Sequence, residues 1–227
     1  MLTVCRIALS AGTSVALVTS PLRWTVLVPL KALPAAKSRL AESLAPHQHV
    51  EVVEAIRADT LAAASEAGLV ARLVLVTDVA WPDLAEGMLN IVQTAPGLNG
   101  GLAEAAAAAA TTWPAEGVAA LVGDLPALQP LELDAALTEA AEHPRSFVPD
   151  SAGTGTTLLA ATPGTELTPA YGPGSAERHR AIAAELAASP GLRADVDTAE
   201  DLESAERLGV GVNTRAVLGR LLGPTTP

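Results

Sequence analysis

From Trp24 onward, short apolar runs alternate with longer segments whose apolar residues recur at helical spacing. No other feature of the chain constrains its fold as strongly. The runs are continuous stretches rich in Val, Leu and Ile, which is typical of strands whose sheet is covered by helices on both faces. The six expected strands span residues 24–28, 72–77, 89–93, 118–123, 146–149 and 156–161.

The segments between and after these runs predict helices. In the first of them Val50, Val53, Ile56 and Leu61 form one apolar stripe, and Gly68 is a plausible C-cap. The expected helices span residues 49–68, 100–113, 130–142, 175–189 and 198–209. Alternating strands and helices with short connections predict one α/β domain, built on an open and mainly parallel sheet flanked by helices. We place this domain at 24–212, between a poorly ordered N-terminal extension, 1–23, and a C-terminal tail, 213–227.

Composition narrows the class of protein further. The formal net charge of −11 argues against a nucleic acid or an anionic membrane as partner, because both require basic surface. A single cysteine, Cys5, excludes an internal disulfide and suits a reducing cytoplasm. Residues 1–23 are apolar, but Ser, Thr and Gly interrupt the run, so we favour an extension over a secretory signal or a membrane span. We therefore expect a cytoplasmic protein.

The loop after the first expected strand gathers positive charge. It contains Lys31, Lys37 and Arg39 and no acidic residue. Ligands of open parallel sheets bind beyond the carboxyl ends of the strands, where this loop begins. Because it lacks glycine, it is neither a P-loop nor a dinucleotide fingerprint. The cations, with the Ser38 hydroxyl, could hold phosphates through side-chain charge. A solvated basic loop is the alternative, which composition alone favours slightly.

Two further segments carry carboxylates that could bind a metal, one directly after an expected strand and one before the last expected helix. Asp124 follows an expected strand, where it could hold a divalent metal beside a phosphate or could cap the next helix. Asp195 and Asp197 project to the same side of an extended segment, and a metal would relieve their repulsion. The alternative is that Asp197 or Thr198 caps the following helix. Capping needs only one of these residues, which favours the metal slightly.

Two glycine-containing segments have the character of anion sites. Around 149–164, two glycines permit a tight turn, and Thr154, Thr156 and Thr157 bring hydroxyl and N–H groups to the start of a strand. An ordinary hairpin would explain the glycines but not three threonines. In "AYGPGSAERHRA" (170–181), Ser175 is the expected N-cap of a helix, and we expect Arg178, His179 and Arg180 in its first turn. An anionic ligand would explain those charges, and solvated arginines are the alternative.

The usual nucleophilic machinery is missing from the sequence. The four histidines do not have zinc-ligand spacing, and we expect His47 and His49 on the surface at the start of a helix. No nucleophile–base pair is evident. This absence suits a reaction whose nucleophile is already an anion, such as a phosphate monoester attacking the α-phosphorus of a nucleotide. The protein then needs only to position the reactants and neutralise their charge.

Taken together, six segments resemble one known family. "VPLKALPAAKSRLAESL", "GLNGGLAEA", "LVGDLPAL", "PDSAGTGTTLLAA", "YGPGSAERH" and "DVDTAEDL" resemble motifs of the guanylyltransferases of coenzyme F420 biosynthesis. The resemblance runs from about Trp24 to about Gly209, and "GTGTT" with "YGPGS" is its most specific part. It implies a MobA-like nucleotidyltransferase, of the Rossmann-type nucleotide-diphospho-sugar transferase fold. Such an enzyme uses GTP and Mg²⁺ and releases pyrophosphate.

The resemblance also implies roles for individual residues. Asp124 matches a metal-binding aspartate, and the second falls at Asp197 or, less favoured, Asp195. Lys31, Lys37 and Asp124 would be the catalytic residues. The nucleotide would bind at Leu30, Lys31, Lys37, Arg39 and Asn99. The three-carbon acceptor would bind at Thr156, Thr157, Gly172, Gly174 and Ser175.

The acceptor is the least determined part of the reaction. The Ala-rich, Lys-poor composition resembles actinobacterial proteins, which implies phosphoenolpyruvate. The alternative acceptor is 2-phospho-L-lactate, which differs by one unsaturation. A different class, a nucleotide-sugar-dependent glycosyltransferase, is suggested by the D-x-D spacing of Asp195 and Asp197. Its position late in the domain counts against that class. We expect small-molecule substrates only, with a homodimer as a candidate assembly.

Overall fold

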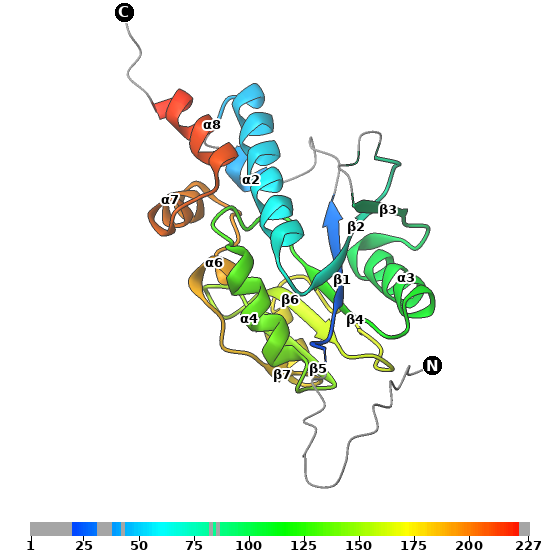
Figure 1. Cartoon of the computed structure of the whole chain (residues 1–227). Helices are drawn as coiled ribbons and strands as arrows, with labels where there is room; N and C mark the ends of the chain where they lie inside the picture. Colours follow the sequence, from blue (N-terminus) through cyan, green and yellow to red (C-terminus); the bar gives the residue numbers. More distant parts are fainter. Residues whose placement is uncertain (1–19, 31–37, 42–43, 82–83, 85–86, 223–227) are drawn as a thin grey trace, which may run out of the picture.

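The computed structural model describes residues 20–30, 38–41, 44–81, 84 and 87–222. Its centre is a seven-stranded sheet in the order β3-β2-β1-β4-β6-β5-β7 (Figure 1). The strands are β1 (Trp24–Leu30), β2 (Val70–Thr77), β3 (Met88–Val92), β4 (Gly117–Leu121), β5 (Arg145–Pro149), β6 (Thr156–Ala161) and β7 (Ala184–Glu185). The six strands expected from the sequence are confirmed, with ends that differ by at most two residues.

The direction of the strands decides where a ligand site can lie. Strands β1 to β4 are mutually parallel, β6 is antiparallel to both β4 and β5, and β7 is parallel to β5. The carboxyl ends of β1, β2, β4 and β5 therefore lie at one edge of the sheet, together with the start of β6. We call this the carboxyl edge and the opposite one the amino edge. The mainly parallel sheet predicted from the sequence is confirmed.

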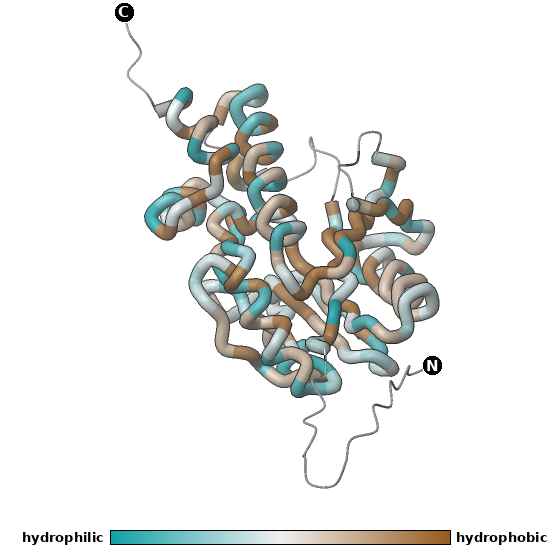
Figure 2. Tube along the Cα trace, viewed as in Figure 1, coloured by the Kyte–Doolittle hydropathy of each residue, from teal (hydrophilic) through white to brown (hydrophobic). Residues whose placement is uncertain are grey.

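Eight helices lie among the described residues. They are α1 (Ser38–Ala41), α2 (Pro46–Glu66), α3 (Gly97–Thr112), α4 (Pro130–Ala140), α5 (Ser175–Arg180), α6 (Pro190–Arg193), α7 (Ala199–Leu208) and α8 (Val212–Leu222). On one face of the sheet, alternate residues of β1 pack with buried residues of α2 and α4. On the other face Leu27 and Val74 pack with Leu102 of α3. Because both faces are covered, the central strands β1, β2 and β4 are mostly apolar and buried (Figure 2).

The helix predicted over 175–189 is wrong in its second half. Helix α5 ends at Arg180, and Ala184–Glu185 instead form the edge strand β7 beside β5. The Leu186 N–H then donates to the Phe147 carbonyl at 2.9 Å, and Leu186 is 3% exposed. Backbone pairing with β5 and burial of Leu186 outweigh the helix propensity of this Ala-rich segment, because propensity differences are only tenths of a kcal/mol per residue.

A third packing layer joins the C-terminal helix to α2. Val53 and Ile56 of α2 are buried with Val217 and Leu218 of α8, a helix within the segment expected as a tail (Figure 1). The carboxylate of Asp59, on α2, accepts from the N–H groups of Asn213 and Thr214, at 3.0 and 2.8 Å. It thereby satisfies donors in the first turn of α8, which have no partner within the helix.

Helix α2 also corrects one expectation about its histidines. His47 is exposed at the start of the helix, as expected, but His49 is buried with only 6% of its surface exposed. His49 lies on the same face as the buried Val52 and Val53, which pack toward α8. Among the described residues, no helix is long and apolar enough to cross a membrane.

Candidate active site

The carboxyl edge brings together the end of β1 and the loops that follow β4 and β5. Gly123, just beyond β4, lies against the end of β1, because a Cβ there would stand 2.7 Å from Leu30 Cδ2. Leu30 itself is 4% exposed and belongs to the core, so only its backbone borders the edge. Lys31 and Lys37 lie outside the described residues. Arg39 is in α1, and its side chain is likewise outside what the structure describes.

The loop that carries Asp124 is fastened on three sides. The Leu125 N–H donates to the hydroxyl of Thr60 on α2 at 2.9 Å, in a buried setting. The Val196 N–H donates to the Asp124 carbonyl at 3.1 Å, and the Gly211 N–H donates to the Pro126 carbonyl at 2.9 Å. The second of these bonds sets the segment 195–197 directly beside Asp124. The structure thus unites the carboxylate segments that the sequence singled out.

A buried arginine contributes to the electrostatics around Asp124. Arg57 is 9% exposed and lies one helical turn before Thr60 on α2. Burial lowers the pKa of the Arg57 guanidinium, and the negative charges of Asp124 and Glu54 oppose that shift. The pattern of the sequence did not single out Arg57, because it falls within an otherwise ordinary helix.

The capping alternative is confirmed at Thr198, one of the two residues proposed for it. Thr198 is the N-cap of α7, and its hydroxyl accepts from the Asp201 N–H at 3.2 Å. The Asp201 carboxylate in turn accepts from the N–H groups of Asp197 and Thr198. The backbone N–H of Asp197 joins this capping box through the Asp201 carboxylate.

The chemistry of these donors fits a divalent metal. Carboxylate oxygens are the ligands that Mg²⁺ prefers, and it is usually bound by one or two carboxylates together with substrate phosphates. Among the residues that the structure describes, no three His, Cys, Asp or Glu side chains are already arranged to hold a metal. Asp124 with Asp195 or Asp197 would supply one or two carboxylates, and the phosphates of a bound nucleotide would have to complete the coordination.

The start of β6 forms the other side of the edge. Thr156 is 6% exposed and Ser175 is 2% exposed, and the Ser175 hydroxyl donates to Thr156 Oγ1 at 3.1 Å. The same Thr156 oxygen lies 2.8 Å from Nδ1 of His179, whose side chain is wholly buried. Thr157 is also fully buried, and its hydroxyl donates to the Val148 carbonyl at 3.4 Å. The expected N-cap, Ser175, is the first residue of α5, and Gly174 is the cap.

The segment 170–174 is held by side chains. Arg178 donates to the carbonyls of Ala170, Gly172 and Pro173, at distances from 2.7 to 3.2 Å. Gly172 and Gly174 have φ of 119° and 71°, in the region that favours glycine. The structure thus gives Arg178 a partner in its own loop, where the sequence had suggested an anionic ligand. Arg180 is paired instead with Glu185, at 2.6 Å.

Asn99 connects this segment to the first turn of α3. Its amide accepts from the Tyr171 N–H at 2.7 Å and donates to the Tyr171 carbonyl at 3.0 Å. The Tyr171 hydroxyl donates to the Ala120 carbonyl of β4 at 3.0 Å, and burial raises the pKa of that hydroxyl. Both the oxygen and the nitrogen of the Asn99 amide thus bond to the backbone of Tyr171.

The turn between β5 and β6 is closed by a carboxylate that the sequence did not single out. Asp150 accepts from the N–H groups of Thr154 and Gly155, at 2.8 and 2.7 Å. Arg193 donates to the carbonyls of Pro149 and Asp150, at 3.2 and 2.8 Å. The "PDSAG" sequence is a turn signal that could have identified Asp150. Nothing in the local sequence points to Arg193, which lies more than forty residues away.

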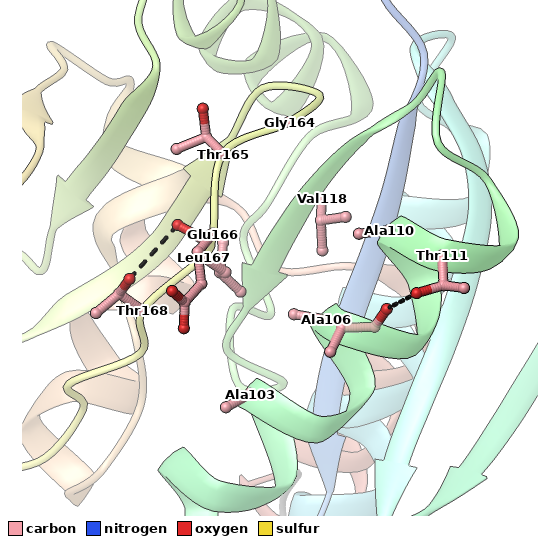
Figure 3. A pocket seen from close by; sticks show the side chains of 11 residues that line it. Ala103, Ala106, Ala110, Thr111, Val118, Gly164, Thr165, Glu166, Leu167 and Thr168 are labelled. Atoms are coloured by element: carbon pink, nitrogen blue, oxygen red, sulfur yellow. Dashed lines mark hydrogen bonds between the residues drawn. The ribbon is translucent and has the colours of Figure 1, made fainter.

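A separate hollow of about 400 Å³ lies between α3 and the segment after β6 (Figure 3). Its lining includes Ala106, Ala110, Val118, Glu166, Leu167 and Thr168. None of the residues proposed from the sequence lines it. The chemistry-bearing side chains are at the carboxyl edge instead.

Comparison with solved structures defines the class of this fold. A Desulfovibrio desulfuricans G20 protein, provisionally assigned as a nucleotide-diphospho-sugar transferase, matches with a TM-score of 0.66 at 16% identity, over 88% of this chain and 95% of that one. A Mycobacterium tuberculosis H37Rv protein in complex with manganese matches with a TM-score of 0.52 at 21% identity, over 82% and 98%. The fold is that of the nucleotide-diphospho-sugar transferases, as the sequence predicted.

Sequence comparison then identifies the family. The family model described as "Guanylyl transferase CofC like" matches residues 24–221. A phosphoenolpyruvate guanylyltransferase of Streptomyces avermitilis is 48% identical over 210 residues, covering 89% of this chain and 97% of the relative. One from Geodermatophilus obscurus is 47% identical over 215 residues, covering 89% and 97%. The chain belongs to the CofC-like guanylyltransferase family and is a nucleotidyltransferase. Both relatives are guanylyltransferases, which favours that class over the glycosyltransferase alternative.

Proposed function

We propose that this protein transfers GMP from GTP to phosphoenolpyruvate, giving enolpyruvoyl-2-diphospho-5'-guanosine and pyrophosphate, as a step of coenzyme F420 biosynthesis. The observation that carries the proposal is the 48% identity to a phosphoenolpyruvate guanylyltransferase, which spans nearly the whole relative. The Asp124 loop at the carboxyl edge supports it, because that edge is where ligands of this fold class bind.

The reaction requires positioning rather than covalent catalysis. A phosphate oxygen of phosphoenolpyruvate attacks the α-phosphorus of GTP, a new P–O bond forms, and the bond from the α-phosphorus to the bridging oxygen breaks. Pyrophosphate leaves with the bond electrons. The nucleophile carries its own negative charge, since the second pKa of a phosphate monoester is about 6, so no side chain has to remove a proton. The protein holds two anions together and offsets their repulsion.

Asp124 with Asp197 or Asp195 would hold Mg²⁺ in this scheme. The metal, when bound, neutralises charge on the phosphates of GTP. The bonds from Leu125 to Thr60 and from Val196 to Asp124 fix the backbone of these carboxylates before substrate arrives. That fixed backbone lowers the cost of organising the site during the reaction.

The nucleotide would lie beside the ends of β1 and β3. Lys31 directly follows the last residue of β1, and we propose that Lys31 and Lys37 contact the triphosphate, with Arg39 and the Leu30 backbone alongside. Asn99 lies in the first turn of α3, the helix that follows β3 in the chain. Its amide holds Tyr171, so we propose that it lies against the nucleotide while keeping the acceptor segment in place.

The acceptor would bind between the start of β6 and the segment 170–175. Thr156, Thr157, Gly172, Gly174 and Ser175 surround this position, as proposed from the sequence. The hydroxyl of Thr157 already has an internal partner, so its contribution would come from the backbone. The two glycines have no side chain of their own beside an anion, and the Arg178 guanidinium packs against both of them.

Pyrophosphate release tests the proposal. The protein is incubated with Mg²⁺, each of the four NTPs, and either phosphoenolpyruvate or 2-phospho-L-lactate. We expect release with GTP and phosphoenolpyruvate. Release only with phospholactate would reassign the acceptor while preserving the reaction class. No release with any pair would refute the proposed function.

A further inference from the structure

The wholly buried His179 makes no contact expected of a catalytic base, yet it contacts both segments around the proposed acceptor position. Its Nε2 accepts a hydrogen bond from the Ala170 N–H at 3.0 Å. Its Nδ1 lies 2.8 Å from Thr156 Oγ1. His179 therefore bridges the segment 170–174 and the start of β6.

The Ala170 contact determines which ring nitrogen carries the proton. A backbone N–H can only donate, so Nε2 must present its lone pair and cannot be protonated. A neutral imidazole with an unprotonated Nε2 carries its hydrogen on Nδ1. Burial keeps the ring neutral, since the pKa of His179 is lowered to about 4 by burial and, secondarily, by the charge of Arg178. The Nδ1–H consequently donates to Thr156.

The direction of the hydrogen bond from His179 to Thr156 determines how the hydroxyls of Thr156 and Ser175 can donate. Thr156 and Ser175 share one hydrogen bond, at 3.1 Å, and together they carry two hydroxyl hydrogens. One hydrogen forms the bond between them. Because the His179 Nδ1–H donates to the Thr156 hydroxyl, the imidazole ring cannot accept the second hydroxyl hydrogen. That hydrogen remains available to a ligand. With the opposite tautomer, Thr156 would donate to Nδ1 and both hydrogens would be consumed.

We propose that His179 is a positioning residue that, as the Nδ1–H tautomer, makes the Thr156–Ser175 hydroxyl pair a hydrogen-bond donor to an oxyanion of the acceptor. The inference rests on the proposed function for the acceptor's identity, a three-carbon phosphate ester with a carboxylate. A pair set to donate favours an anionic oxygen, which can only accept. A neutral hydroxyl at the same position can also accept this hydrogen bond, but it binds less strongly than an anionic oxygen.

Nitrogen NMR on the substrate-free protein tests the tautomer. A long-range ¹H–¹⁵N spectrum distinguishes protonated from unprotonated ring nitrogens, and the signals missing from His179→Gln assign the residue among the four histidines. We expect a protonated Nδ1 and an unprotonated Nε2 at pH 7. A protonated Nε2 would overturn the proposal whatever the enzyme does with phosphoenolpyruvate, which separates its failure from that of the proposed function.

Two isosteric variants test the consequence for binding. In His179→Asn the amide nitrogen takes the place of Nδ1 and can still donate to Thr156. In His179→Gln the terminal amide takes the place of Nε2 and can accept from Ala170, but the donor to Thr156 is lost. We expect His179→Gln to raise the KM for phosphoenolpyruvate by roughly tenfold, as for a lost bond to a charged group, with the KM for GTP unchanged. His179→Asn should raise it less. Equal effects, or effects that follow thermal stability alone, would overturn the proposal.

A double-mutant cycle separates this route from general damage to the fold. Thr156→Val removes the hydroxyl into which His179 donates, so the double variant with His179→Gln should be little worse than Thr156→Val alone. Additive losses would count against a shared route. His143→Gln, at the turn before β5 on the amino edge, is the matched control and should leave both KM values unchanged.

Discussion

The two edges of the sheet use polar side chains in different ways. At the amino edge, one cluster of side chains bonds internally, whereas others such as Asp134 and Arg145 bond to backbone. The Thr25 hydroxyl donates to Glu116 at 2.6 Å, and Arg72 pairs with the same carboxylate. The Arg72 guanidinium also stacks over the Trp113 ring, 4.5 Å from its centre. These groups satisfy each other and close the end of the domain.

At the carboxyl edge, side chains bond mainly to loop backbone. Asn99 holds Tyr171, Arg178 holds the segment 170–173, and Arg193 holds the turn at Asp150. Each bond fixes the course of a loop instead of neutralising another side chain. The comparison teaches that the polar residues of one edge serve stability, whereas those of the other pre-organise a binding surface. Substitutions at the two edges should therefore separate these effects.

The largest difference is expected between two aspartates. Asp124→Asn should reduce turnover roughly a hundredfold or more, because it weakens a ligand for the proposed metal. Its fold should persist, since the Val196 N–H bonds to the backbone of residue 124 and not to the side chain. Steady-state kinetics and a thermal melt of the same preparation measure both properties.

Asp134→Asn is the matched control for Asp124→Asn. Asp134, on α4, accepts from the N–H groups of Gly68 and Leu69 ahead of β2, at the amino edge. Losing one acceptor should cost about 1 kcal/mol of stability and leave turnover intact. If Asp134→Asn abolished turnover, or Asp124→Asn left it undiminished, the division between the edges would not hold.

The second effect is the loss of folding stability at acidic pH that His179 causes. The folded pKa of His179, about 4, lies below the ordinary value of 6.5. As the pH falls through 6.5, the His179 ring of the unfolded chain takes up a proton. The ring of the folded protein does so only near pH 4. The stability associated with the neutral ring is therefore complete above pH 6.5 and lost as pH falls toward 4. Between pH 7.5 and 4.5, wild type should lose about 2 to 3 kcal/mol more than His179→Gln. Urea unfolding at the two pH values measures this, and parallel losses would contradict it.

A third, smaller effect is expected at the amino edge. Glu116→Gln keeps the shape of the side chain but removes its charge, so Arg72 loses its ionic partner in a partly buried setting. We expect a loss of about 1 to 2 kcal/mol in the free energy of unfolding, with unchanged kcat and KM. A kinetic change without a stability change would show that this edge also takes part in catalysis.

The smallest effect is expected from Arg193→Lys. A lysine can reach only one of the two carbonyls that Arg193 bonds, so the turn at Asp150 loses one fastening. Stability should fall by about 0.5 to 1 kcal/mol. The KM for phosphoenolpyruvate should rise a few-fold while that for GTP stays constant. A shift in the KM for GTP instead would move this turn to the nucleotide side.

Local patterns sufficed to predict the framework of the sheet and one side of the site. Continuous Val/Leu runs marked the strands because both faces of the sheet are buried. Asp124 could be predicted at the carboxyl edge because it directly follows β4. Whether the predicted lysines, Lys31 and Lys37, line the site stays a prediction.

The contacts that hold the loops could not be predicted, because their partners are distant in the chain. Thr60 bonds Leu125 across 65 residues, and Asn99 bonds Tyr171 across 72. The β7 strand was missed for a similar reason: its local sequence favours a helix, and only the neighbouring β5 makes an extended conformation favourable. Residues whose role is to position others leave a weak local signal.

The bond from Gly211 to Pro126, with the contacts of Asp59 to residues 213 and 214, has a consequence for synthesis of the protein on the ribosome. The Asp124 loop receives this hydrogen bond from a residue that follows every strand of the sheet in the sequence. A nascent chain in which every strand has been synthesised, but not yet Gly211, still lacks that hydrogen bond. The Asp124 loop of a growing polypeptide can therefore form all of its hydrogen bonds only after the whole sheet has been synthesised.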